Sequence, residues 1–156
     1  MSRLRVLYVD DEPDICEVVQ LALSLDPGFW TRTCVSGRDA LAAAVDWSPD
    51  IILCDVVMPG MDGPATLARL RECPRTADTP FVFITSRAQA REIKHFRSLG
   101  VTGVIVKPFD PMTLAHSVRC QLRSVGRSGS NPLREIAEDV GERSGAFSCN
   151  ESRSAA

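Results

Sequence analysis

Residues 51–63 read IILCDVVMPGMDG, and they begin as a buried strand that ends in a carboxylate. Residues 51–54 form a continuous apolar run, which is typical of a strand covered on both faces of a sheet. Asp55 follows directly, and a turn-rich string comes after Val56 and Val57. A lone Asp in this place is usually a helix cap or a strand terminator. The question is whether charged groups from elsewhere in the chain converge on it.

The composition is that of an ordinary globular protein. The chain has 156 residues, of which 44% are hydrophobic and 24% charged, so it suits one domain with a real core and is short for two. A net charge of −2 gives no reason to expect nucleic acid or an anionic membrane as a partner. No apolar span of membrane length and no leader pattern is visible, so we expect a cytoplasmic protein. The six cysteines form no CxxC pair, which argues against a zinc site.

Strand and helix patterns alternate along the chain. We predict strands at residues 4–9, 29–35, 51–54, 81–85 and 103–106, and helices at residues 14–25, 37–47, 63–71, 89–99 and about 112–122. Five such βα units indicate an α/β fold, a doubly wound parallel sheet with helices on both faces. The flavodoxin-like strand order 2-1-3-4-5 fits this pattern best, and ligands then bind at the carboxyl ends of the strands, beside the first and third.

The last part of the chain has a different character. Residues 124–156 are rich in Ser and Gly and poor in large apolar groups. We therefore expect one folded domain over residues 1–123 and a mostly disordered tail or linker over residues 124–156. Only residues 132–140 could form a short helix there.

Four of the predicted strands end in charged or hydroxyl side chains. Asp10 and Asp11 follow the first strand, Asp55 the third, Thr85 ends the fourth, and Lys107 follows the fifth. In the predicted topology these groups share one sheet edge. Crowded carboxylates repel one another, and Mg²⁺ with carboxylate and water ligands removes the conflict. Lys107 is one of only two lysines among 18 basic residues, consistent with a need for a compact ammonium.

Such an edge suits the binding of one phosphoryl group. Asp55 would be the nucleophile and form an aspartyl phosphate. Mg²⁺ and Lys107 would neutralise the phosphoryl oxygens, and Thr85 would donate a hydrogen bond to one of them. No general base is needed, because a carboxylate is already ionised near neutral pH. We interpret Glu12 as a helix-cap partner rather than a metal ligand.

These residues resemble the receiver domain of two-component response regulators, the CheY-like family, over about residues 3–123. The resemblance rests on four motifs: Asp10-Asp11, Asp55 leading into residues 58–63 (MPGMDG), Thr85-Ser86, and Lys107-Pro108-Phe109. It implies that Asp55 accepts a phosphoryl group from a sensor histidine kinase or a His-phosphotransfer protein.

The resemblance also implies how the site is built. Asp11, Asp55 and the backbone carbonyl of Val57 would ligate Mg²⁺ (or Mn²⁺) directly, and Asp10 would act mostly through water. The Lys107–Pro108 peptide bond would be cis, which only X-Pro bonds reach cheaply. Gly60 and Gly63 would serve the tight backbone of the loop.

Three residues around the site bear on switching. The family usually carries an aromatic residue three positions before the Lys, and here that position is Val104. Val104 is therefore either a plain core residue or part of a modified switch, and both interpretations stay open. Val57 and Arg87, two residues beyond Asp55 and Thr85, flank the phosphoryl site in the family. We expect them to set the lifetime of the phosphoryl group, with no direction predicted.

Other functions compete with that of a phosphoacceptor switch. We do not expect an enzyme beyond self-catalysed phosphotransfer and autodephosphorylation, because an aspartyl-phosphate hydrolase usually needs a second acid where Val57 stands. A flavin or nucleotide binder would need a glycine-rich loop after the first strand, which is absent. A receiver-like module that docks without phosphate stays as the alternative, because of Val104.

The sequence leaves two possibilities for the output of the domain. No DNA-binding segment follows residue 123, so the chain is either a stand-alone receiver or an N-terminal fragment of a longer regulator, and we favour the former because the tail ends in SRSAA. A stand-alone receiver would bind an unknown downstream protein through the face of its fourth helix, fifth strand and fifth helix. We expect no direct contact with nucleic acid or membrane, and a homodimer stays open.

Overall fold

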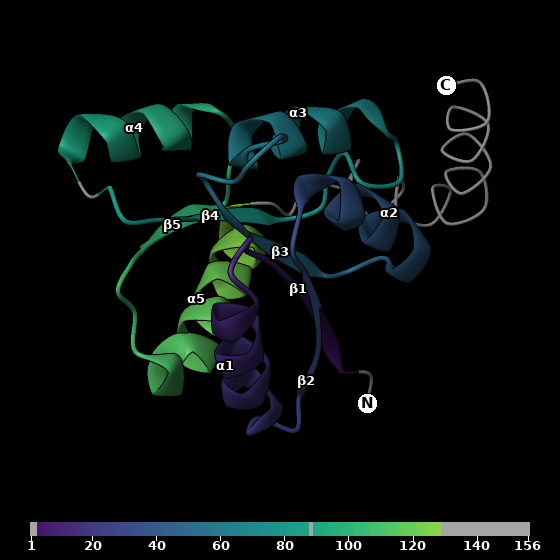
Figure 1. Ribbon diagram of the computed structural model, residues 1–156, viewed down its shortest axis with the longest axis vertical. Coiled ribbons are helices and arrows are strands. Elements are labelled where there is room, and N and C mark those ends of the chain that lie inside the picture. The colour runs from purple at the N-terminus through teal and green to yellow at the C-terminus, as the bar shows by residue number, and fades with distance from the viewer. Residues whose placement is uncertain (1–2, 88, 129–156) are drawn as a thin grey trace.

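Strands and helices alternate along the whole described chain. The structure is a computed structural model and describes residues 3–87 and 89–128 (Figure 1). The elements are β1 (Leu4–Val9), α1 (Pro13–Ser24), β2 (Phe29–Cys34), α2 (Gly37–Trp47), β3 (Ile51–Asp55), α3 (Gly63–Glu72), β4 (Phe81–Thr85), α4 (Ala90–Ser98), β5 (Gly103–Val106) and α5 (Pro111–Ser128).

The five strands form one parallel sheet in the order β2-β1-β3-β4-β5, which confirms the predicted topology. Every residue of β3 and β4 is buried, whereas β2 at the edge alternates between buried and exposed positions. Helices α2, α3 and α4 cover one face of the sheet, and α1 and α5 cover the other (Figure 1). The continuous apolar runs thus form the central strands because helices cover them on both sides.

The predicted helix ends hold with one notable difference. Helix α5 runs to Ser128, six residues beyond the predicted end, so that residues 124–128 continue the helix rather than begin a tail. Val125 is half-buried and extends the apolar stripe of Leu114, Val118 and Leu122 by one turn. The Ser and Gly content of residues 124–128 obscured the helical spacing of these apolar residues in the sequence. The remainder of the predicted tail, residues 129–156, lies outside the described residues.

Two polar side chains and one glycine define helix ends. Ser36 Oγ accepts a hydrogen bond from the Asp39 amide at 3.1 Å and caps α2. Asp110 Oδ1 accepts one from the Met112 amide at the start of α5. Gly100 follows α4 with φ +84°, a backbone conformation that a residue with a Cβ adopts only with strain.

An ion pair fastens α5 to the turn between α1 and β2. The Arg119 guanidinium donates to both carboxylate oxygens of Asp26 at 2.9–3.0 Å and lies over the Phe29 ring, 4.6 Å from its centroid. The hydrogen bond from Arg119, with a second from the Gly28 amide, holds the pKa of Asp26 below its usual range. The pair is partly exposed, so its contribution to stability is sensitive to salt and pH.

Asp26→Asn should therefore destabilise the protein in a pH-dependent way. A carboxyl whose pKa is lowered on folding contributes stability above its ordinary pKa of about 3.9, and this contribution is lost as the pH falls through the folded value. Urea unfolding should show a lower midpoint for Asp26→Asn than for wild type at neutral pH, and the difference should vanish in strong acid. Asp46→Asn, an exposed acid without an ion pair in the described part of the chain, is the control. A difference of equal size at all pH values would contradict the ion-pair explanation.

Candidate functional site

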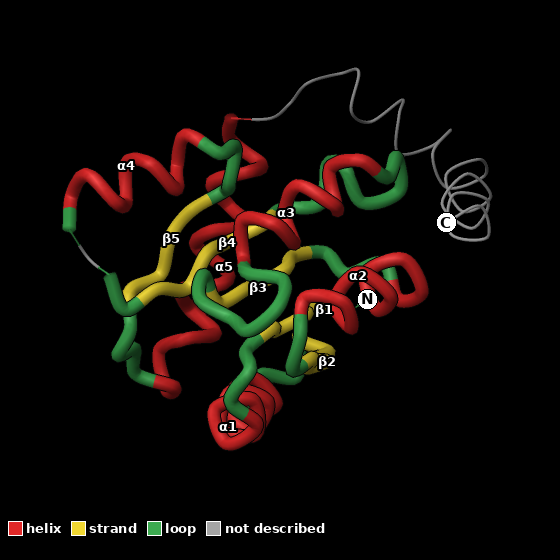
Figure 2. The backbone as a smooth tube through the Cα atoms, turned by 45° about the horizontal axis from the view of Figure 1, so that its top comes forward, coloured by secondary structure: helices red, strands yellow, loops and turns green. Residues whose placement is uncertain are grey.

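The strand register brings the predicted side chains to one edge of the sheet. Val9 pairs with Cys54, so Asp10 and Asp55 each stand one residue further along neighbouring strands. Figure 2 shows the loops after β1 and β3 lying next to each other at this edge. Carboxylate oxygens of Asp10, Asp11 and Asp55 all lie within 4.8 Å of one another. The acid cluster predicted from the sequence is therefore present.

Lys107 joins the two buried acids of this cluster. Its Nζ lies 2.9 Å from Asp10 Oδ2 and 3.3 Å from Asp55 Oδ2, and the two carboxyl-bearing residues are 0% and 9% exposed. Burial alone would lower the pKa of Lys107, but the hydrogen bond and charge of Asp10 outweigh it and raise that pKa, which keeps the ammonium charged. Burial, followed by the charge of Asp10, raises the pKa of Asp55, and Lys107 opposes that shift. One ammonium thus faces three carboxyl groups.

Asp10 is held by two further donors that the sequence analysis missed. The hydroxyl of Tyr8 donates to Asp10 Oδ2 at 2.9 Å, and the Glu12 amide donates to Asp10 Oδ1 at 3.1 Å. Tyr8 is fully buried, and burial, then the carboxylate of Asp10, raises its pKa. The signal was available: Tyr8 is the only Tyr of the chain and stands two residues before Asp10, a spacing that puts both on the same side of a strand.

The interpretation of Glu12 as a helix-cap partner is confirmed by its position but not by its side chain. Glu12 occupies the N-cap position of α1, but its side chain makes no capping hydrogen bond. Its contribution to the cluster is the backbone amide that binds Asp10, and Pro13, which has no amide hydrogen, begins the helix.

Thr85 lies at the same edge with its side chain already engaged. It is 2% exposed, and its Oγ1 accepts a hydrogen bond from the Arg87 amide at 2.9 Å. Its carbonyl accepts one from the Lys107 amide at 2.7 Å, so the backbones that carry the hydroxyl and the ammonium are tied together. Thr85 Oγ1 uses a lone pair in the bond from Arg87, which leaves its own hydrogen free to donate.

The other predicted residues, Val57, Arg87 and Val104, lie in two different environments. Val57 is 62% exposed, and Arg87 is exposed as well. Val104 is partly buried and packs against the apolar cluster between the sheet and helices α2, α3 and α4. The position that the family gives to an aromatic residue is thus filled here by a core-packing side chain.

The loop between β3 and α3 lies directly against the backbone of Asp55. Gly60 has φ +75°, and a Cβ on Gly63 would lie 2.6 Å from the carbonyl oxygen of Asp55. Only glycine therefore fits at position 63 without movement of the loop. The Lys107–Pro108 peptide bond is cis, as expected.

Tyr8→Phe should destabilise the domain, because it removes a buried donor to a carboxylate. We expect a loss of about 1.5–3 kcal/mol in the free energy of unfolding, the range for hydrogen bonds to charged groups. Thr31→Val is the matched control, since Thr31 Oγ1 is buried and has no hydrogen-bond partner in the described structure. The measurement is the free energy of unfolding of both variants in urea. Equal losses for the two would mean that the Tyr8 hydroxyl has no special partner.

Known proteins resemble this chain over most of the described region. Residues 6–119 match the family described as the response regulator receiver domain. The chain belongs to this family. The receiver is 36% identical over 124 residues to the DNA-binding dual master transcriptional regulator RpaA of Synechocystis sp., covering 79% of this chain and 51% of the relative. It is 34% identical over 138 residues to the transcriptional regulatory protein CseB of Streptomyces avermitilis, covering 88% and 57%.

Solved structures agree with the family assignment. The receiver is 33% identical to the chemotaxis protein CheY4 of Vibrio cholerae, with a TM-score of 0.70, over 76% of this chain and 98% of that one. A response regulator from Desulfuromonas acetoxidans is 28% identical with a TM-score of 0.69, over 77% and 97%. The chain spans about half the length of the curated relatives named above. Among the described residues, no helix has the length and apolar character needed to cross a membrane.

Proposed function

We propose that this receiver accepts a phosphoryl group on Asp55 from a phosphohistidine of a sensor histidine kinase or His-phosphotransfer protein. The observation that carries the proposal is the bridge of Lys107 between Asp10 and Asp55, with Asp11 beside it. A partly buried lysine that pairs with two acids stabilises the added charge of a phosphoryl group on one of them. Asp55 belongs to a fully buried strand, which holds the nucleophile rigidly.

The donor set fits a hard divalent cation. Three carboxyl groups within 4.8 Å of one another, opposed by one ammonium, leave an excess of negative charge that oxygen-preferring Mg²⁺ (or Mn²⁺) balances. We propose that Asp11, Asp55 and the carbonyl of Val57 bind the ion directly and that Asp10 acts through water. When bound, the ion supplies positive charge to the oxygens of the transferred phosphoryl group.

The protein groups then have distinct tasks in the transfer. An oxygen of Asp55 forms a bond to phosphorus as the bond from phosphorus to the donor imidazole nitrogen breaks, and that nitrogen keeps the electron pair. Lys107 keeps its proton and pairs with the phosphoryl oxygens. Thr85 donates its free hydroxyl hydrogen to one of those oxygens. Water later attacks phosphorus as the bond from phosphorus to the Asp55 oxygen breaks; inorganic phosphate leaves with the protons of the water, and Asp55 regains its carboxylate.

The transferred group changes the charge of the edge. A phosphoryl group adds about −1.5 to −2 charges at pH 7. We propose that this change is read by a downstream protein on the face of α4, β5 and α5, in a cytoplasmic setting and without direct contact of this domain with nucleic acid or membrane. The phosphoacceptor step needs neither an output domain nor a second copy of the chain.

Intact mass spectrometry after incubation with acetyl phosphate tests the proposal. Wild type should gain the mass of one phosphoryl group in Mg²⁺, and Asp55→Asn or an excess of EDTA should prevent the gain. Asp62→Asn is the matched control, because Asp62 is an exposed acid of the same loop whose capping of α3 an Asn can replace. A wild-type chain that gains no mass would favour the docking module that acts without phosphate, and the acid cluster would then be a structural cation site.

Val57 and Arg87 should set how long the phosphoryl group survives. Both residues are exposed, and they follow Asp55 and Thr85 by two residues at the carboxyl edge of the sheet. Val57→Asn with Arg87→Ala should change the rate of phosphoryl loss by about threefold or more, equivalent to about 0.6 kcal/mol in the barrier. The same changes at Val18 and Arg123, which are exposed on α1 and α5, serve as the control. An unchanged rate of loss in the Val57 and Arg87 variant would reject this role.

A further inference from the structure

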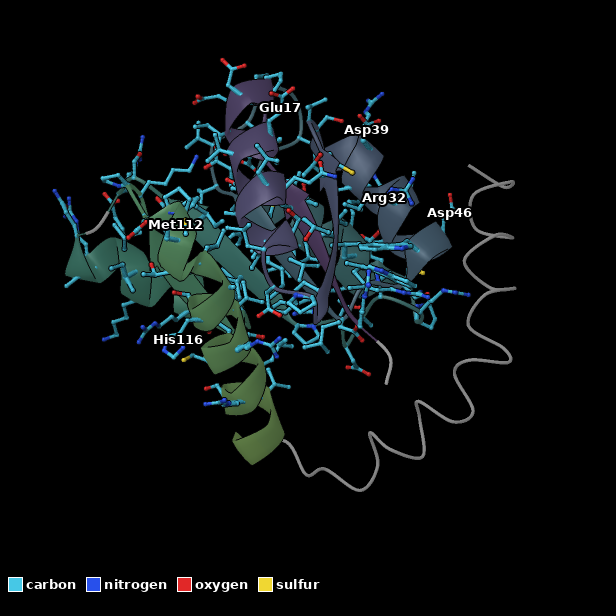
Figure 3. The ribbon with its side chains drawn as sticks, turned by 90° about the horizontal axis from the view of Figure 1, so that it is seen from below. Glu17, Arg32, Asp39, Asp46, Met112 and His116 are labelled. Atoms are coloured by element: carbon cyan, nitrogen blue, oxygen red, sulfur yellow. The ribbon has the colours of Figure 1, made fainter. Side chains whose placement is uncertain are left out.

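Tyr8 connects the apolar core to the acid cluster. It belongs to the group of buried apolar residues between the sheet and helices α1 and α5. Glu17 on α1 and His116 on α5 point outward from these helices (Figure 3). Tyr8 and Asp10 are both 0% exposed, so the 2.9 Å hydrogen bond from the Tyr8 hydroxyl to Asp10 Oδ2 is shielded from water. In such surroundings a hydrogen bond to a charged group has a strong electrostatic effect.

The carboxylate of Asp10 has little capacity left to accept hydrogen bonds. Its Oδ2 accepts from the Tyr8 hydroxyl and from Lys107 Nζ, each at 2.9 Å, and these two bonds occupy both lone pairs. Its Oδ1 accepts from the Glu12 amide at 3.1 Å. Among the described residues, these bonds leave one lone pair on Oδ1, which suits the proposed contact of Asp10 with a cation through water. Tyr8 and Lys107 thus share one oxygen of Asp10.

The position of Asp10 is held by other groups than Tyr8. The Asp10 amide donates to the Cys34 carbonyl at 3.1 Å, and the Asp10 carbonyl accepts a hydrogen bond from the Cys16 thiol at 3.3 Å. The Glu12 amide holds Oδ1 of the side chain. Removal of the Tyr8 hydroxyl therefore changes chiefly the charge that Asp10 exerts on its neighbours, and its place in the site changes little.

We propose that Tyr8 is a positioning residue of the phosphoacceptor site and acts through Asp10. A donor on Asp10 Oδ2 offsets part of the carboxylate charge, so Asp10 attracts Lys107 and a divalent cation less strongly. Lys107 Nζ, 2.9 Å from Asp10 and 3.3 Å from Asp55, then stays close enough to Asp55 to pair with a phosphoryl group there. The inference rests on the proposed function and adds the residue that divides the lysine between the two acids.

The competing explanation is that Tyr8 only fills the core. The two roles differ in what they change. Lost packing or a lost hydrogen bond lowers stability without altering the charges at the site. A hydroxyl that offsets the charge of Asp10 has two effects of opposite sign: its removal strengthens the binding of a cation, and it slows phosphoryl transfer because Asp10 draws Lys107 away from Asp55.

Isothermal titration calorimetry with Mg²⁺ alone, on the full chain at a temperature where each variant is folded, tests the first effect. Tyr8→Phe should bind Mg²⁺ about threefold or more tightly than wild type. Intact mass followed over time with acetyl phosphate and saturating Mg²⁺ tests the second effect. Uptake by Tyr8→Phe should be slower by about threefold or more. Val118→Ala, which removes packing from the same apolar group without contact to an acid, should leave both quantities unchanged.

A fluorinated tyrosine tests the same idea without loss of the ring or the hydroxyl. Tyr8 is the only tyrosine of the chain, so growth on fluorotyrosine, with fluorine ortho to the hydroxyl, labels this position alone. The more acidic hydroxyl donates more strongly to Asp10, and Mg²⁺ should then bind more weakly than to wild type. The single fluorine NMR resonance should shift when Mg²⁺ is added.

Unchanged or weaker Mg²⁺ binding by Tyr8→Phe would overturn the proposal. So would a rate of phosphoryl uptake equal to that of wild type, or a wild-type chain that binds no Mg²⁺. The calorimetry contains no phosphoryl donor, which separates this inference from the proposed function. A chain that shows the expected order of Mg²⁺ affinities but takes up no phosphoryl group would refute the phosphoacceptor step and leave the effect of Tyr8 on the cation site standing.

Discussion

Two buried carboxyl groups, Asp10 and Asp55, lie side by side at the end of the sheet, and the ammonium of Lys107 bonds to both. Like charges so placed would repel each other strongly in a medium of low polarity, and removal of the lysine would leave both uncompensated. The lysine is 97 residues away from Asp10 in the chain. It reaches the acids only because β1, β3, β4 and β5 are adjacent in the sheet, so the site exists only when the whole topology has formed.

The sheet in turn explains why the nucleophile is held so firmly. Asp55 is the last residue of β3, a strand with every position buried and with neighbours on both sides. The following loop returns onto it closely enough that Gly63 has no room for a Cβ. Burial of the strand fixes the backbone, and the loop covers it, while the carboxyl group remains at the edge. The same packing that stabilises the core therefore presents the reactive group.

The sequence alone was sufficient for most features that depend on local periodicity and on the order of the strands. The strand bounds, the 2-1-3-4-5 order and the meeting of Asp10, Asp11, Asp55 and Lys107 followed from those two features. It did not provide one side-chain contact of the site and the end of one helix. Tyr8, which counts as an apolar residue in a strand pattern, donates a hydrogen bond to the charged group of Asp10. The last turn of α5 was not predicted because the Ser and Gly content of residues 124–128 outweighed the helical spacing of Val125.

The replacement of an aromatic switch residue by Val104 has a consequence for how a signal would leave the site. Val104 is partly buried against the core and has no ring that could turn. The connection that remains runs along the chain itself: Thr85 Oγ1 binds the Arg87 amide, and α4 begins three residues later. A turn of the Thr85 side chain toward a phosphoryl group would alter that bond and pull on the segment leading into α4. One buried ring, Phe96, anchors this helix to the core. The switch would then be carried by the backbone after β4.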